Sequence, residues 1–310
     1  MRKLKNILYP TDFSRCAEQA LTHAVHFAEQ YGAQLHMLHA VILHAYDPNN
    51  PEMVFPSLDD EDLRRQLNEL AGQKMQAAAA AHGAEKLVVR HVEDRGISAA
   101  AVILDYAKRN DMDLIVMGTH GRRGLSHMLL GSVAEEVVRH ARCPVLTVRE
   151  RQEPARWDEV DRILVPVDFS EHSRRAVTYG KILADSYGAR LQILHVFEQQ
   201  IHPAFYAIGK TSLLQVDPDL GSRARLEMSR MVAEAPGPEV EVDVHVAEGK
   251  AAREIVRFAG EQASDFVVIA THGLTGLEHF LLGSVAEKVV RKAPCPVLTV
   301  SKPGHAFKMP

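Results

Sequence analysis

A glycine-rich loop between a predicted strand and a predicted helix is the stretch of this sequence best suited to bind a ligand. The apolar run 114–117 predicts a buried strand, and apolar residues recur at helical spacing after Gly131-Ser132. Glycines let a backbone approach a ligand closely, and the free N–H groups at a helix start attract anions. The Ser132 hydroxyl can add a hydrogen bond. The loop is therefore a candidate phosphate cradle, although it lacks the Gly-Lys-Ser/Thr of a Walker A loop.

The same loop occurs a second time in the chain. Residues 271–300 repeat residues 119–148, and because 7 of the 30 aligned positions differ, 23 are identical. The strand at 163–168 likewise repeats 7–12. This self-similarity indicates an internal duplication. We expect domains over 1–149 and 161–301, a linker over 150–160 and a loosely ordered tail over 302–310.

Strands and helices alternate along each half, which predicts an α/β fold with a parallel sheet and helices on both faces. Ser14 and Ser98 are candidate N-caps, and Gly32 is a candidate helix stop. In the second half, Asp217-Pro218 predicts an N-cap followed by a proline at the first helical position. The predicted strands of the first half are 7–9, 35–41, 87–89, 114–117 and 145–148, and its helices follow Ser14, span 58–82, follow Ser98 and follow Gly131.

Composition and charge argue against several classes of function. The net charge of −4 and the lack of a long basic run give no reason to expect nucleic-acid binding. No apolar stretch approaches membrane-spanning length, and residues 1–6 show no signal-peptide core. The cysteines, Cys16, Cys143 and Cys295, are too few and scattered for a disulfide framework or a zinc site. We therefore expect a cytoplasmic protein without membrane or nucleic-acid partners.

With these residues in hand, the chain resembles the universal stress protein family, specifically its tandem, UspA-like two-domain members. One element of the resemblance is an aspartate after the first strand of each half, Asp12 and Asp168. The other is the family's Gly-x-x-Gly-(nine residues)-Gly-Ser/Thr pattern. The first half has the complete pattern in Gly118, Gly121, Gly131 and Ser132. The second half has Gly273, Gly283 and Ser284, with Ala270 where the first glycine should be.

The resemblance implies a Rossmann-like, adenine nucleotide alpha hydrolase-like domain in each half, with a doubly wound five-stranded sheet. ATP would lie across the carboxyl ends of the strands, with Mg²⁺ bridging its phosphates. The implied nucleotide-binding residues of the first half are Asp12, Ala40, Val41, Gly118, Gly121, Arg122, Gly131, Ser132 and Val133. The corresponding, weaker set of the second half is Asp168, Val196, Phe197, Ala270, Gly273, Gly283, Ser284 and Val285.

The apolar runs 145–148 and 297–300 read as strands buried on both faces. If either run formed the unpaired edge strand of a separate domain, it would favour aggregation. We therefore expect the halves to pack as an intramolecular pseudo-dimer, as the resemblance also implies. Dimerisation of the whole chain stays open.

The leading interpretation is a stress-response protein that binds ATP and acts as a nucleotide-dependent signalling module, with no catalytic residues assigned. One alternative is a slow ATPase, for which we find no Walker B carboxylate, catalytic lysine or arranged general base. Another is a non-nucleotide adaptor that recognises an unknown protein through the proline-containing loop at 42–58. We expect the first half to be the tighter site. The second half has Ala270, Leu274, Thr275 and Phe197 in place of Gly118, Arg122, Arg123 and Val41.

Overall fold

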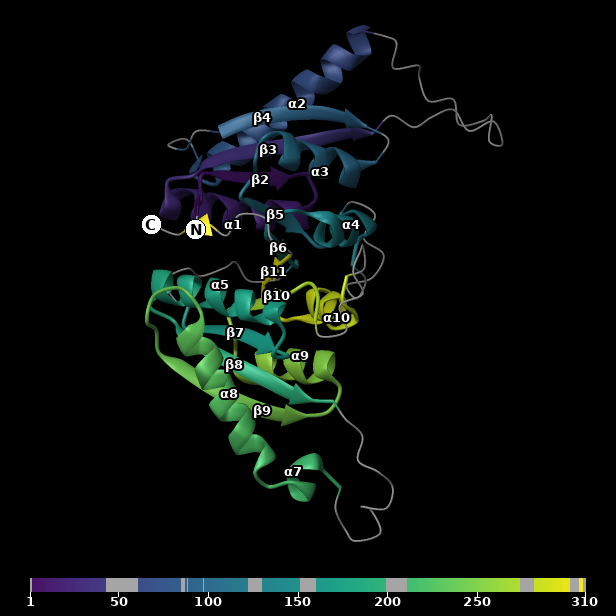
Figure 1. Ribbon diagram of the computed structural model, residues 1–310. Helices are drawn as coiled ribbons and strands as arrows, with labels where there is room; N and C mark the ends of the chain where they lie inside the picture. Colours follow the sequence, from purple (N-terminus) through teal and green to yellow (C-terminus); the bar gives the residue numbers. More distant parts are fainter. Residues whose placement is uncertain are drawn as a thin grey trace, which may run out of the picture. The chain divides into compact units, whose positions relative to one another are not determined.

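The chain forms two compact units, residues 1–155 with 305–310 and residues 156–304. The computed structural model describes residues 2–42, 61–84, 87, 89–96, 98–121, 130–150, 160–198, 211–273, 282–301 and 307–308. Each unit has helices on both sides of a parallel sheet (Figure 1). Within the described residues, no helix is both long and apolar enough to span a membrane.

The first unit contains a five-stranded parallel sheet with the order β4-β3-β2-β5-β6. Its strands are β2 (Asn6–Pro10), β3 (Gln34–Ile42), β4 (Val89–Gly96), β5 (Leu114–Gly118) and β6 (Val145–Val148). Its helices are α1 (Arg15–Tyr31), α2 (Glu61–Ala81), α3 (Ala99–Arg109) and α4 (Ser132–His140). Helices α1 and α2 lie on one face and α3 and α4 on the other, as right-handed crossovers in opposite directions require.

The second unit repeats this arrangement in the order β9-β8-β7-β10-β11. Its strands are β7 (Arg162–Val167), β8 (Arg190–Phe197), β9 (Val242–Glu248), β10 (Phe266–Ala270) and β11 (Val297–Val300). Its helices are α5 (Glu171–Tyr187), α7 (Leu213–Val216), α8 (Leu220–Glu234), α9 (Ala251–Glu261) and α10 (Ser284–Lys292). The predicted tandem of doubly wound five-stranded sheets is confirmed.

The strand order locates a change of winding direction in each sheet. Counted along the chain, the strands of the first unit lie in the order 3-2-1-4-5, as in the first five strands of a Rossmann fold. The direction reverses between β2 and β5, and in the second unit between β7 and β10. Open α/β sheets bind ligands in the crevice at the carboxyl ends of such neighbouring strands.

The predicted helix ends agree with the structure in the first unit. Ser14 caps α1, because its Oγ accepts the N–H of Ala17 at 3.3 Å, and Gly32 ends the helix in the left-handed region with φ 60°. Ser98 caps α3 in the same way, accepting the N–H of Ala101 at 3.1 Å.

Three sequence-based predictions differ from the structure. The third strand begins at Val89 and not at Leu87, whose N–H instead closes a turn on the Ala84 carbonyl at 3.0 Å. Asp217 ends α7 and accepts the N–H of Asp219, so Asp219 takes the N-cap position of α8. In the tail, β12 (Phe307–Lys308) pairs in parallel with β1 (Arg2–Lys3) and satisfies backbone groups of that strand.

A buried aspartate ties the start of β2 to β5. Asp113 Oδ2 accepts the backbone N–H groups of Lys5 at 2.8 Å and Asn6 at 3.0 Å. Asp265 makes the same pair of bonds, to Asp161 and Arg162, at the start of β7. These anchors fix the relative positions of the two strands that flank each reversal point.

Candidate functional site

Asp12 lies in the turn between β2 and α1, at the carboxyl edge of the first sheet. Its Oδ1 accepts the N–H of Ser14 at 3.0 Å. The next residue, Phe13, has φ 62°, a region that bulky side chains rarely adopt, and its N–H donates to Thr11 Oγ1 at 3.0 Å. Hydrogen bonds on both sides therefore hold a strained turn, a feature that clusters at functional sites.

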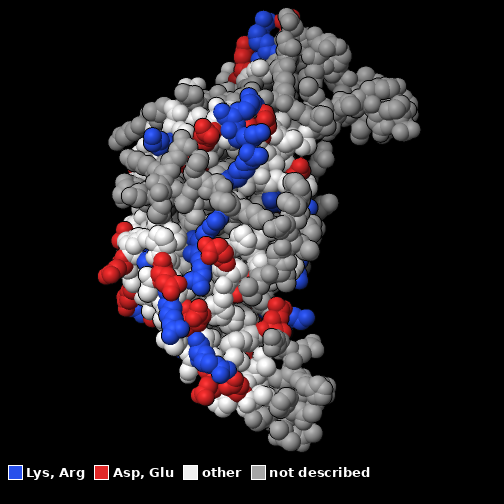
Figure 2. Space-filling view, in the orientation of Figure 1, with Lys and Arg blue, Asp and Glu red and all other residues white. Residues whose placement is uncertain are grey.

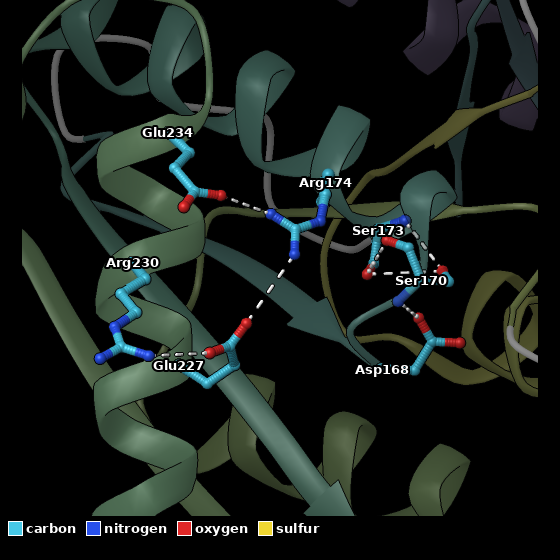
Figure 3. Close-up of polar contacts among 7 residues, drawn as sticks. All are labelled: Asp168, Ser170, Ser173, Arg174, Glu227, Arg230 and Glu234. Atoms are coloured by element: carbon cyan, nitrogen blue, oxygen red, sulfur yellow. Dashed lines mark hydrogen bonds and ion pairs between the residues drawn. The ribbon is translucent and has the colours of Figure 1, made fainter.

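The second unit builds the same turn from Asp168. Its Oδ1 accepts the N–H of Ser170 at 3.0 Å, and Phe169 has φ 64°. Figure 3 shows the Asp168 carboxylate beside Ser170, at the start of α5. The two strained turns are thus equivalent in backbone conformation and in carboxylate hydrogen bonding.

The glycine loop passes directly against this carboxylate. A Cβ placed on Gly121 would lie 2.5 Å from Asp12 Oδ2, and one on Gly273 would lie 2.4 Å from Asp168 Oδ2. Real Cβ atoms do not approach oxygen so closely, so each position requires glycine unless the carboxylate moves. The structure thus brings together two residues that are far apart in sequence, at the strand pair where the winding reverses.

The end of the loop closes on its own beginning. The Gly131 N–H donates to the Thr119 carbonyl at 2.8 Å, and a Cβ on Gly131 would lie 3.0 Å from that oxygen. Gly283 and Thr271 repeat the bond at 2.8 Å. Gly131 is the N-cap of α4 and supplies no side-chain acceptor, so no capping side chain takes up the N–H groups at the helix start. Close approach within the turn accounts for this glycine without a ligand.

Gly118 lies against α1. A Cβ there would meet Cys16, at 2.9 Å from its Sγ and 3.0 Å from its carbonyl carbon. In the second unit, His172 aligns with Cys16 and Ala270 aligns with Gly118. The His172 ring lies 5.8 Å from the ring of His272. The glycine at the first position of the pattern thus allows close helix–strand packing.

An aromatic pair flanks the aspartate turn of the first unit. The Phe13 ring lies 4.7 Å from His39, whose Nδ1–H donates to the Thr11 carbonyl at 2.9 Å. The Lys74 ammonium, from α2, lies 5.4 Å from the Phe13 centroid, within the range of a cation–π interaction. Sequence analysis missed these residues, because only the fold brings β3 and α2 to the turn.

The second unit keeps the corresponding pair of rings and adds a third ring, Phe197. Phe169 lies 4.4 Å from His195, whose Nδ1–H donates to the Val167 carbonyl at 2.9 Å. Phe197 meets the other side of the cluster, edge-on to His195 at 4.7 Å. Burial lowers the pKa of His195, so its imidazole is neutral near pH 7.

The remaining predicted residues are distributed along the same edge. Ser132 and Ser284 are exposed at the starts of α4 and α10, and the half-buried ones are Ala40, Val133, Val196, Gly283 and Val285. The Val41 side chain, Arg122 and residues 43–58 of the predicted loop lie outside the described residues.

Burial raises the pKa of Cys143 to about 12, which keeps that thiol protonated and unreactive.

The described residues contain no group of three or more histidine, cysteine or acidic side chains that could bind a metal on its own. His120 and His272 are each hydrogen-bonded to the preceding threonine hydroxyl, at 2.8 and 2.9 Å. Hydrogen bonding within the turn thus accounts for both histidines. His127 and His279 lie outside the described residues.

The fold defines a tandem α/β protein with the same arrangement of an aspartate turn and a glycine loop in each half. The model of the universal stress protein family matches residues 3–149 and 159–301. The chain therefore belongs to the universal stress protein family, as a tandem member.

Individual relatives support this assignment along the whole chain. Universal stress protein MJ0531 of Methanocaldococcus jannaschii is 36% identical over 143 residues, 46% of this chain and 82% of that protein. Universal stress protein Slr1230 of Synechocystis is 27% identical over 312 residues, 96% of this chain and 99% of the relative. A universal stress protein structure from Archaeoglobus fulgidus has a TM-score of 0.72 at 23% identity, and the match covers 97% of this chain and 100% of that one. The last comparison shows the same fold in tandem form.

Proposed function

We propose that the chain binds ATP at the carboxyl edge of its first sheet and acts as a nucleotide-dependent signalling module in the cytoplasm. The observation that carries the proposal is the contact of Gly121 with Asp12 at the strand pair where the winding reverses. There the Asp12 carboxylate lies against the backbone of a glycine. The loop then ends at the start of α4, where no side chain caps the helix. A carboxylate suits the hydroxyl and amino groups of a nucleoside, and a helix N-terminus suits phosphates.

The roles proposed for the individual residues follow the resemblance to the family. Asp12 and the end of β3, with Ala40 and Val41, would hold the adenosine, and Gly121, Arg122, Gly131, Ser132 and Val133 would surround the phosphates. Gly118 would act indirectly, by letting β5 pack against Cys16. Mg²⁺ would enter with the phosphates and offset their charge.

Calorimetry with MgATP on the full chain tests this proposal through a charge placed at Ser132. The Ser132 side chain is exposed at the first turn of α4. The helix dipole stabilises a carboxylate at this position, so Ser132→Glu should fold normally. Its charge would repel the phosphates and weaken ATP binding by about tenfold or more. The neutral isostere Ser132→Gln is the control. Equal ATP affinity in the two variants would contradict a phosphate site at α4.

The second half offers a matched variant. Ser284→Glu places the same charge at the start of α10, where Ser284 is also exposed. We expect ATP binding to depend more on Ser132 than on Ser284, because the second loop lacks the two arginines of the first. A larger loss from Ser284→Glu would reverse this ranking of the halves.

Turnover is expected to be slow or absent. The carboxylate against the glycine loop is Asp12, whose Oδ1 accepts the Ser14 N–H and whose Oδ2 faces Gly121, so it is not arranged to activate a water molecule. A phosphate-release assay should give rates far below about 10 per second, a typical enzyme value. Hydrolysis at that ordinary rate would favour the ATPase alternative.

A further inference from the structure

The second-half site differs from the first by an added aromatic ring. Phe197 ends β8 where the first half has Val41 at the end of β3. Its ring is half-buried and meets His195 edge-on at 4.7 Å, while His195 lies 4.4 Å from Phe169. Three rings therefore gather beside Asp168, where the first half has the pair of Phe13 and His39. Aromatic faces of this kind stack on nucleobases.

The second difference is the loss of a positive charge beside the turn. The buried residues Ala71 and Met75 of α2 align with Ala224 and Met228 of α8, which places Glu227 where the first half has Lys74. Lys74 lies over Phe13 and supplies a cation to that site. Glu227 supplies a carboxylate instead.

Two arginines of the second half, Arg174 and Arg230, form ion pairs with acidic side chains of α8. In Figure 3, Glu227 lies between Arg174 of α5 and Arg230 of α8, at 3.8 Å from each, and Arg174 also pairs with Glu234 at 2.9 Å. The wider surface follows the same pattern, since basic and acidic side chains stand next to one another on the face in Figure 2. The second loop also has Leu274 and Thr275 in place of two arginines. Lys250 follows Gly249, whose N–H donates to the Phe197 carbonyl at 3.0 Å, so a cation remains near that ring. The second glycine loop, where phosphates would lie, thus carries less positive charge than the first.

From these differences we propose that the second half binds an adenine nucleoside without phosphate groups, whereas the first half takes ATP. Asp168 would accept hydrogen bonds from hydroxyl or amino groups, and Phe197 would stack on the base. The proposal rests on the proposed function, because it assumes that both edges are nucleoside sites. Under this proposal, the two halves of one chain bind two different ligands.

Equilibrium dialysis of the full chain with adenosine and with MgATP, separately and in competition, tests this assignment. Wild type should bind one adenosine that excess ATP does not displace. Phe197→Val copies the first half and should weaken adenosine binding by about fivefold or more, through the lost stacking, while ATP affinity changes less than about twofold. Phe197→Tyr keeps the ring and should retain adenosine. Phe197→Leu keeps the bulk without the ring, and should lose adenosine even if the valine variant does not fold.

The outcomes separate the two proposals. Adenosine that ATP displaces fully, with no effect of Phe197→Leu, would overturn the nucleoside site and leave the ATP site standing. Adenosine binding that survives ATP and depends on Phe197 would support the assignment. If ATP also fails to bind wild type, the proposed function itself is wrong, whatever adenosine does.

Discussion

At the scale of single residues, the sequence identified residues that the fold brings together at the carboxyl edge of the sheet, but not the side chains around them. Asp12, Gly121 and Gly131 stood out because their types and spacing recur in both halves. The contact of Gly121 with Asp12 could be expected from a parallel sheet, since β2 and β5 end at one edge. The sequence does not predict that Lys74 lies over Phe13 or that Cys16 lies against Gly118, because these contacts depend on how α2 and α1 pack on the sheet. Sequence patterns do not encode that packing.

A half-buried histidine, His26, supplies a test of pH dependence at this scale. Burial on α1 lowers the pKa of His26 to about 4, against about 6.5 in an unfolded chain. Between these values the unfolded chain binds more protons, so stability is full above pH 6.5 and falls as the pH drops toward 4.

The prediction is that His26→Gln removes part of this pH dependence. Chemical denaturation at pH 7 and pH 5 should show that wild type loses more stability than the variant, by on the order of 1 kcal/mol. The full pKa shift would imply a larger difference in the free energy of unfolding, but the imidazole is only half-buried and solvent partly screens its charge. His195 and His245, whose pKa values burial also lowers, are present in both proteins, so their contributions cancel. Parallel losses in the two proteins would contradict the prediction.

At the scale of elements, periodicity and capping residues located most helices and strands, and the errors have local causes. The start of the third strand was set too early because Leu87 and Val89 are both apolar, yet Leu87 belongs to the turn after α2. The duplication helped, since each half confirmed the other. It also misleads where the halves pack differently, as one position in α5 shows.

Gly180 lies inside α5, where the first half has Ala24. By sequence, Gly180→Ala should stabilise the helix by about 1 kcal/mol. In the structure its Cβ would lie 2.5 Å from Val165 Cγ2 and 2.9 Å from Leu191 Cδ1. We therefore expect a net loss of about 1 kcal/mol, because overpacking outweighs the gain in helix propensity.

Gly260→Ala is the matched control. A Cβ at this position in α9 would meet no atom within 4 Å, so the substitution should raise stability by about 0.5–1 kcal/mol. Urea denaturation of both variants gives the comparison. Stabilisation by Gly180→Ala would mean that the helix–sheet spacing in the second unit adjusts freely.

At the scale of the whole molecule, duplication explains why one chain carries two candidate sites with diverged surroundings. Each unit has its own sheet and reversal point, so one site can change without rebuilding the other. The substitutions that distinguish the halves lie at the strand ends and on the covering helices, at Phe197 and Glu227. The aspartate turns, with their strained phenylalanines, are the same in both halves. The framework is therefore retained while the side chains around the candidate sites differ.

The last prediction concerns the halves expressed separately, as residues 1–155 and 156–304. The runs 145–148 and 297–300 are apolar at every position except one threonine, and in its own unit each strand pairs with one neighbour, β5 or β10. In an isolated half, that strand would present an open apolar edge that favours pairing with another chain. Each half should therefore self-associate at micromolar concentration, measured by sedimentation velocity. Leu146→Lys or Leu298→Lys should restore monomers, and circular dichroism must show that the variant half is still folded, because both leucines are buried. An equivalent lysine on an exposed helix position, Gln73→Lys, should not. Two monomeric halves would argue against the pseudo-dimer that the sequence predicts, because edges that stay unpaired in isolation do not need a partner in the intact chain.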